Sequence, residues 1–327
     1  MSKEIKWITT AKGIGIFLVV LGHVNRGLNN ANIYNQNSFY VIDYLIYTFH
    51  MPLFFFLAGI FFLKSLDKRG FKIFSLDKIN LLLYLYIIWS IIQFVIQLIL
   101  NNYINGSISY SDILYVFVQP KGQMWFLYVL LLIFIINAAI FSVIKTNNNR
   151  KYLIAFLLIC SILLRINKIT EIVILDKIGV NILFFYFGVM FSLFSIKMYA
   201  YKHFIYRSIV FILYLLVVYS NLLENDVIYD NQVLPAVLGV MFIILLSLNP
   251  LIQKVFNYIG RYSLEIYLAH IIFASGIRII LDKFFHVDIL ILHIVLGLVF
   301  GLLAPLTLLK LSESLKPIKY LFKNVSS

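Results

Sequence analysis

A lysine and a histidine on one apolar run form the pair best suited to chemistry in this sequence. Lys12 and His23 are eleven positions apart, about three helical turns, so they share one helix face about 16 Å apart along its axis. Gly15 and Gly22 near that face allow a neighbouring helix or a ligand to approach the backbone. A cation and an imidazole inside an apolar span predict a functional site. The alternative is a lysine that snorkels to a lipid headgroup and a histidine at a hydrated interface.

A second histidine precedes a proline in the next apolar run. Pro52 cannot donate a hydrogen bond to the carbonyl of Thr48, so the pattern predicts a kink that frees one acceptor. His50 lies inside that turn. It is either a core histidine bonded to freed backbone or a second acid or base.

Later in the chain, Ser263, Tyr267 and His270 follow i, i+4, i+7 spacing, which predicts one polar face on an apolar helix. Glu265 projects from another face of that helix, near its predicted cytoplasmic end. Glu265, Tyr267 and His270 are candidates for substrate contact. Ser263 belongs to the same polar face as Tyr267 and His270, and no role is assigned to it.

Two further stretches have both an ordinary and a functional interpretation. Gln123 and Trp125 open the fourth apolar run and are candidates for substrate contact, although a tryptophan there is ordinarily an interface anchor. The segment from Lys64 to Lys78 is predicted to be the most basic loop. It reflects either membrane topology or a funnel that attracts phosphate groups toward Lys12.

The composition places these residues in an all-α, polytopic membrane protein. Hydrophobic residues make up 62% of the 327 residues and the mean hydropathy is +0.95, well above a soluble domain. We expect a single domain over 1–327, a first span that is retained rather than cleaved, and no appended soluble domain. Ten runs are long enough to be helices that cross a bilayer: about 7–25, 40–63, 79–100, 123–144, 152–166, 178–196, 206–222, 232–248, 262–281 and 288–310.

The charges predict the orientation. The net charge is +13, but the cations fall in short segments between apolar runs, so lipid and topology explain them better than nucleic acid. With a cytoplasmic N-terminus, 19 Lys and Arg residues lie inside and 6 outside, so both termini are predicted to be cytoplasmic. Lys12 then lies toward the cytoplasm and His23 toward the outer side. The polar stretch 101–121 and the acidic loop 224–230 are predicted outside.

The sequence lacks the motifs that are typical of several common enzyme classes. The sequence has no Gly-rich phosphate loop, no His-Glu-x-x-His helix and no Gly-x-Ser-x-Gly elbow, and its one cysteine, Cys160, excludes an intrachain disulfide. His23, His50 and His270 lack carboxylates at ligand spacing, so no metal is expected. What remains suits a general base that activates a hydroxyl, with an anionic donor arriving from the opposite side.

These residues resemble the membrane acyltransferase-3 family. Lys12-x10-His23 is similar to its Arg/Lys-x10-His signature, and the run from Phe49 to Gly59 is similar to its second-helix motif. Trp125-Phe-Leu and the run from Ser263 to His270 match further family stretches in the expected order. The resemblance covers nearly the whole chain and is greatest for the fucose 4-O-acetylase branch.

The resemblance implies acyl transfer, usually of acetyl, from cytoplasmic acetyl-CoA to a sugar hydroxyl of a cell-surface glycan or its lipid-linked precursor. It implies His23 as the catalytic base and His50 as its partner or a second acid or base. It implies Lys12 and Lys78 as cations that bind donor phosphates or stabilise developing charge at the thioester carbonyl. It also implies a multi-pass protein of a bacterial plasma membrane, in contact with lipid and without a nucleic-acid partner, and leaves a homodimer open.

The sequence also departs from the family pattern at the third helix. The family often carries Arg-x-x-Arg before a Leu-Leu-x-Pro-Tyr run, whereas this chain has Lys78-Ile-Asn-Leu81 and no proline before Tyr84.

Two other classes of protein compete with the enzyme. A transporter or flippase of glycan or lipid-linked sugar would use the histidines as a proton relay, but the chain lacks the repeated halves common in transporters. A scaffold subunit would not need Lys12 and His23 in register.

Overall fold

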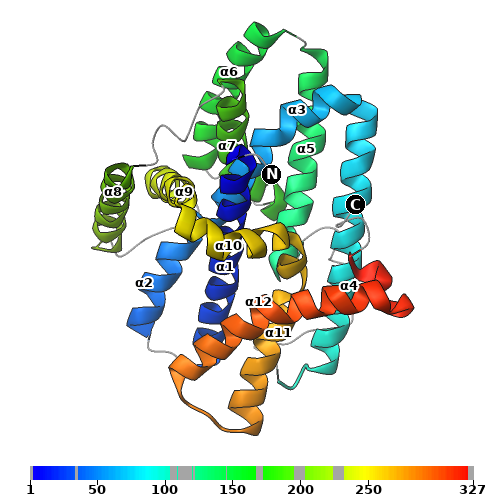
Figure 1. Ribbon diagram of the computed structural model, residues 1–327, viewed down its shortest axis with the longest axis vertical. Helices are drawn as coiled ribbons and strands as arrows, with labels where there is room; N and C mark the ends of the chain where they lie inside the picture. The colour runs from blue at the N-terminus through cyan, green and yellow to red at the C-terminus, as the bar shows by residue number, and fades with distance from the viewer. Residues whose placement is uncertain are drawn as a thin grey trace.

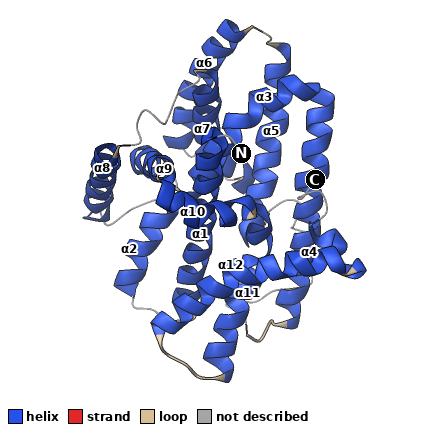
Figure 2. Cartoon of the chain, viewed as in Figure 1, coloured by secondary structure: helices blue, strands red, loops and turns tan. Residues whose placement is uncertain are grey.

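The computed structural model is helical throughout and describes residues 3–33, 36–103, 109, 120, 122–144, 146–166, 172–194, 203–223 and 232–322. Within these ranges there is no β-strand (Figure 2). Most of the predicted outer stretch 101–121 and the acidic loop 224–230 lie outside them.

The α-helices are α1 (Lys3–Asn30), α2 (Gln36–Tyr47), α3 (His50–Lys78), α4 (Tyr84–Ile99), α5 (Trp125–Val143), α6 (Asn147–Ile166), α7 (Val173–Leu193), α8 (Phe204–Leu223), α9 (Val233–Ser247), α10 (Pro250–Arg261), α11 (Ser263–Ile279) and α12 (Leu290–Ser314). Short π and 3₁₀ turns are η1 (Ile79–Leu83), η3 (Gly122–Met124), η6 (Ile280–Phe284) and η7 (Lys316–Phe322).

Helix α1 is the axis of the bundle (Figure 1). It contacts α2, α3, α9, α10, α11 and α12, so elements from both halves of the chain pack against it. Its helix is unbroken from Lys3 to Asn30, which confirms the register of Lys12 and His23. Residues on this helix are therefore held by neighbours that are remote in sequence.

The described helices confirm an all-α, polytopic membrane bundle. Seven helical stretches are long and apolar enough to cross a membrane, or eight if the α9–α10 pair, bent by 104°, counts as one. One stretch, Phe39–Ile99, is 61 residues long and contains two of the predicted runs, whereas α6 does not meet the test for a span. The prediction of ten crossings and of cytoplasmic termini stays a prediction.

The basic loop predicted from Lys64 to Lys78 is wrong, because these residues belong to α3. Lysine, arginine and leucine favour helix, so the chain stays helical beyond its apolar part. The helix breaks only at Gly70, whose φ of 73° suits a residue without a Cβ. An ion pair of 2.8 Å between Arg69 and Asp77 bridges the break.

Helix α10 was not predicted, although its start carries a clear signal. The Asn249 side chain caps the helix by accepting a hydrogen bond of 2.9 Å from the backbone N–H of Leu251, and Pro250 occupies its first turn. The run is too polar and too short to be a span, so a search for apolar runs passes over it.

The kink predicted near Pro52 is confirmed and is a complete break. Helix α2 ends at Tyr47, and Phe49 has a non-helical φ of −135° before α3 begins at His50. Pro52 lies in the first turn of α3, where its missing N–H leaves no intrahelical bond unmade. The break places the first residues of α3 at the functional site.

Candidate functional site

A cavity of about 430 Å³ lies where the N-terminal turns of α3, α5 and α7 meet α1 and α11. Five of the residues predicted from the sequence line it: His23, His50, Gln123, Trp125 and Tyr267. Its other lining residues are Val19, Arg26, Tyr47, Thr48, Met51, Pro52, Gly122, Arg165, Lys177, Val180 and Asn181.

The two predicted catalytic histidines meet at this cavity around one tyrosine. The ring of Tyr47 lies edge-on to both imidazoles, 4.6 Å from His50 and 6.4 Å from His23 between ring centres. A Cβ atom at Gly22 would lie 2.9 Å from Cε2 of Tyr47, so glycine is needed for this approach. The predicted close approach at Gly22 is therefore made by a neighbouring helix end.

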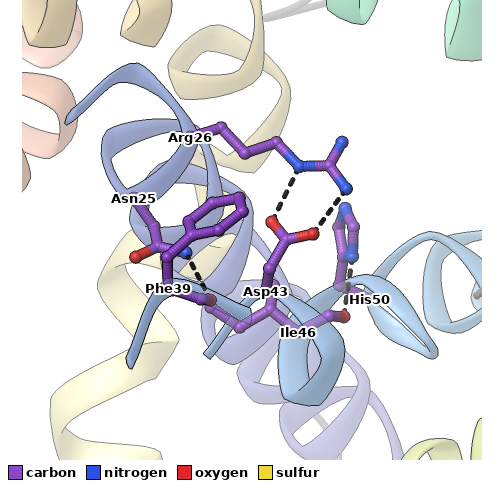
Figure 3. A network of polar contacts seen from close by, with 6 residues as sticks. All are labelled: Asn25, Arg26, Phe39, Asp43, Ile46 and His50. Atoms are coloured by element: carbon purple, nitrogen blue, oxygen red, sulfur yellow. Dashed lines mark hydrogen bonds and ion pairs between the residues drawn. The ribbon is translucent and has the colours of Figure 1, made fainter. Parts of the chain in front are cut away.

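His50 is bonded to backbone at the helix break, as one interpretation of the sequence expects, and its role as an acid or base stays a prediction. Its Nδ1 donates a hydrogen bond of 2.8 Å to the carbonyl of Ile46, which also accepts from the backbone N–H of Phe49 at 3.4 Å. The other nitrogen points toward the guanidinium of Arg26 (Figure 3). His50 is buried but lines the cavity, so one nitrogen fixes the ring while the other side faces polar groups.

An ion pair beside the histidines was missed by the sequence analysis. Arg26 donates two hydrogen bonds to Asp43, of 2.7 and 2.8 Å, which join α1 to α2 (Figure 3). Asp43 is 2% exposed, and Cζ of Arg26 lies 3.1 Å from the ring centre of Tyr47. The signals were available: Arg26 is one helical turn after His23, and Asp43 is the only carboxylate in the run 40–63.

His270 lies behind His23 rather than in the wall of the cavity. It is fully buried, and its ring centre is 5.2 Å from that of His23. Its Nδ1 donates to the carbonyls of Tyr267, at 2.8 Å, and Ile266, at 3.1 Å. The hydroxyl of Tyr267 in turn donates to the backbone carbonyl of Gln123. The predicted polar face of α11 thus reaches the site through Tyr267 and His270.

Besides Arg26, the cavity wall contains two cations that were expected only as outer-side charges. Arg165 on α6 donates to the carbonyl of Val180 and, at 3.0 Å, to that of Gln232. Lys177 on α7 lies 5.4 Å from the ring centre of Trp125. Trp125 is therefore part of the cavity wall. A tryptophan that only anchors the protein at the membrane interface would not need that position.

The predicted donor-binding lysines lie outside the cavity. Lys12 is half-buried and has no hydrogen bond or ion pair within the described part of the chain. Lys78 lies 4.7 Å from the ring centre of Phe134 and 5.6 Å from that of Phe74. Glu265 is also outside the cavity, buried, with one carboxylate oxygen that has no partner among the described residues. The roles of these three residues stay predictions.

Comparison with known proteins agrees with the sequence motifs. The sequence model of the acyltransferase-3 family, described as an acyltransferase domain, matches residues 5–310. No curated protein and no solved structure matches the chain. The match covers α1 to α12 and includes every cavity residue, so the chain belongs to the acyltransferase-3 family and is a membrane acyltransferase.

Proposed function

We propose that this protein transfers an acetyl group from cytoplasmic acetyl-CoA to a sugar hydroxyl of a cell-surface polysaccharide or its lipid-linked precursor. The observation that carries the proposal is the convergence of His23 and His50 on one cavity with polar walls in a membrane acyltransferase. A volume of about 430 Å³ is enough for a sugar unit beside a thioester. The acceptor identity follows from the likeness of the first-helix run to sugar O-acetylases.

His23 acts as the general base in this proposal. It accepts the proton of the sugar hydroxyl while the hydroxyl oxygen attacks the thioester carbonyl of acetyl-CoA. The carbon–sulfur bond then breaks, and the departing CoA sulfur takes up a proton to leave as the thiol. His50 serves as the second acid or base, and its Nδ1 bond to Ile46 supports that role by fixing the ring.

The cavity also offers groups that stabilise negative charge on the thioester oxygen. The side-chain amide of Gln123 is buried, and its nitrogen has no hydrogen-bond partner among the described residues. An amide N–H aimed at a developing oxyanion is a recurrent catalytic device. The N-termini of α3 and α5 add their positive dipole ends to the same wall.

The remaining predicted residues divide between the two substrates. Trp125 offers a flat apolar surface against which a sugar ring can stack, and Tyr267 borders the same cavity. Lys12 and Lys78 bind phosphates of the donor from the cytoplasmic side. Glu265 stays a predicted substrate contact outside this cavity.

The experiment uses membranes that contain the protein and acetyl-CoA labelled in its acetyl group. We expect label in surface polysaccharide or lipid-linked sugar as an ester that mild alkali releases. His23→Ala should abolish the label, whereas His203→Ala, at an exposed histidine far from α1 in sequence, should retain it. Unlabelled glycan with well-folded wild-type protein would contradict the proposal and favour a transporter or a scaffold.

A further inference from the structure

One nitrogen of His270 has no assigned task. Nδ1 is held against its own helix by the carbonyls of Ile266 and Tyr267, so the ring orientation is fixed. Nε2 on the other side of the ring is fully buried and has no hydrogen-bond partner within the described residues. A buried polar atom without a partner is costly and is uncommon in folded proteins. Its placement therefore calls for a function.

The helix that carries His270 is held by two hydrogen bonds in the turn that precedes this ring. The hydroxyl of Tyr267 donates to the carbonyl of Gln123, and Nε2 of Gln93 donates to the carbonyl of Leu268 at 3.3 Å. These bonds tie α11 to η3 and α4 two and three residues before His270. The imidazole is consequently presented from a rigid part of the bundle.

His23 is the group that this nitrogen can serve. The two rings are 5.2 Å apart between centres and tilted by 48°. That separation allows a nitrogen-to-nitrogen hydrogen bond of about 3 Å after a small rotation of the more exposed His23 ring. Because Nδ1 of His270 carries the proton given to its own helix, Nε2 is an acceptor in the neutral ring.

We propose that His270 is a positioning residue for His23: its Nε2 accepts a hydrogen bond from one ring nitrogen of His23. The other nitrogen of His23 then presents its lone pair to the cavity, in the tautomer that a general base requires. When His23 takes the proton of the acceptor hydroxyl, the same bond stabilises the imidazolium. No atom of His270 contacts the substrate in this scheme, and it gains no proton. The inference rests on the proposed function of His23.

Two amide variants separate positioning from a structural role. An asparagine on a helix can donate to the carbonyl four residues earlier, as Asn137 does at 2.8 Å and Asn181 at 2.9 Å in this chain. His270→Asn therefore keeps the bond to the backbone but does not reach His23. His270→Gln places an acceptor oxygen near the position of Nε2.

If His270 positions His23, we expect His270→Asn to lower kcat about tenfold and to leave the KM for acetyl-CoA unchanged. His270→Gln should keep kcat within about threefold of wild type. Thermal unfolding in detergent provides the control for folding of both variants. Equal kcat for both folded variants, or a higher kcat for His270→Asn, would show that only the backbone bond of His270 matters and would overturn the proposal.

A second readout does not require the enzyme to be an acetyltransferase. Diethyl pyrocarbonate acylates an imidazole nitrogen that carries a lone pair, and mass spectrometry follows its addition to His23. We expect this rate to fall about fivefold in His270→Asn and to stay near wild type in His270→Gln. Equal rates in all three proteins would refute the hydrogen bond. If wild-type protein transfers no acetyl group yet the rates differ, the proposed function fails while the His23–His270 pair stands.

Discussion

The two polar ends of α1 are built differently. Around His23, the neighbouring side chains already have fixed partners inside the protein: Arg26 has Asp43, and His50 and His270 have backbone carbonyls. At the other end, Lys12 is half-buried and Lys78 lies against the rings of Phe74 and Phe134. Neither lysine makes an ion pair with a carboxylate within the described residues.

This difference teaches what each end needs. A base has to be oriented before its substrate arrives, because the protein gains nothing from reorganising during the reaction. A cation without an ion-pair partner gains most when a ligand supplies the negative charge. Under the proposed function, the His23 end therefore suits a reaction site and the Lys12 end suits an anion-binding site.

The largest effect that tests this comparison is expected at His23. His23→Ala should lower kcat about 10²–10⁴-fold, the usual contribution of a general base, while the KM for acetyl-CoA changes little. Steady-state kinetics on purified protein in detergent, at matched protein concentration, would measure both constants. A variant with near-wild-type kcat would remove His23 from the chemistry.

The ion pair beside the cavity should respond unequally to removal of either partner. Arg26→Gln leaves the Asp43 carboxylate buried without its counter-charge, and we expect a loss of about 2–3 kcal/mol in the free energy of unfolding. Asp43→Asn leaves an Arg26 side chain that is 41% exposed and still solvated, so the loss should be nearer 1 kcal/mol. Chemical unfolding in detergent compares the two, and equal losses would mean that the pair is hydrated.

At the other end of α1, Lys12→Gln should act on the donor. Loss of a charge-assisted contact of roughly 1.5–3 kcal/mol corresponds to about 10–100-fold in kcat/KM for acetyl-CoA. The KM for the acceptor should stay unchanged, and Lys12→Arg should recover much of the loss. Lys254→Gln, at an exposed lysine on α10, is the matched control and should behave as wild type. Unchanged donor kinetics in Lys12→Gln would leave a lysine that only snorkels to lipid.

The smallest expected signal concerns which end of α1 faces the cytoplasm. In a Cys160→Ser background, Lys3→Cys and Lys323→Cys should resist a membrane-impermeant thiol reagent in intact cells and react after permeabilisation. The excess of Lys and Arg in the inside segments is the physical reason. Reaction of either cysteine in intact cells would contradict ten crossings with both termini inside, and reaction of Lys3→Cys would also reverse the assignment of donor and acceptor sides.

The sequence alone determined the features that depend on neighbours along the chain. Apolar runs located most of the helices, because the cost of unpaired backbone in lipid makes a long apolar run helical. The register of Lys12 and His23, the break before Pro52 and the polar face of Tyr267 and His270 all follow from local helical geometry. The helical continuation from Lys64 to Lys78 was not predicted, because its many charges indicated a loop. The helix propensity of the same residues favours the helix that the structure shows.

Only the tertiary structure decided which of these residues meet. His23 and His270 are remote in sequence, and packing of α11 against α1 brings their rings to 5.2 Å. Packing of other helices pairs Arg26 on α1 with Asp43 on α2, and brings Arg165 and Lys177 into the cavity wall. It leaves Lys12 and Glu265 outside that wall. Helical periodicity fixes the face on which a side chain lies, but the partner of that face depends on how the helices pack. That packing is a balance of many weak contacts spread over the whole chain, which no local pattern encodes.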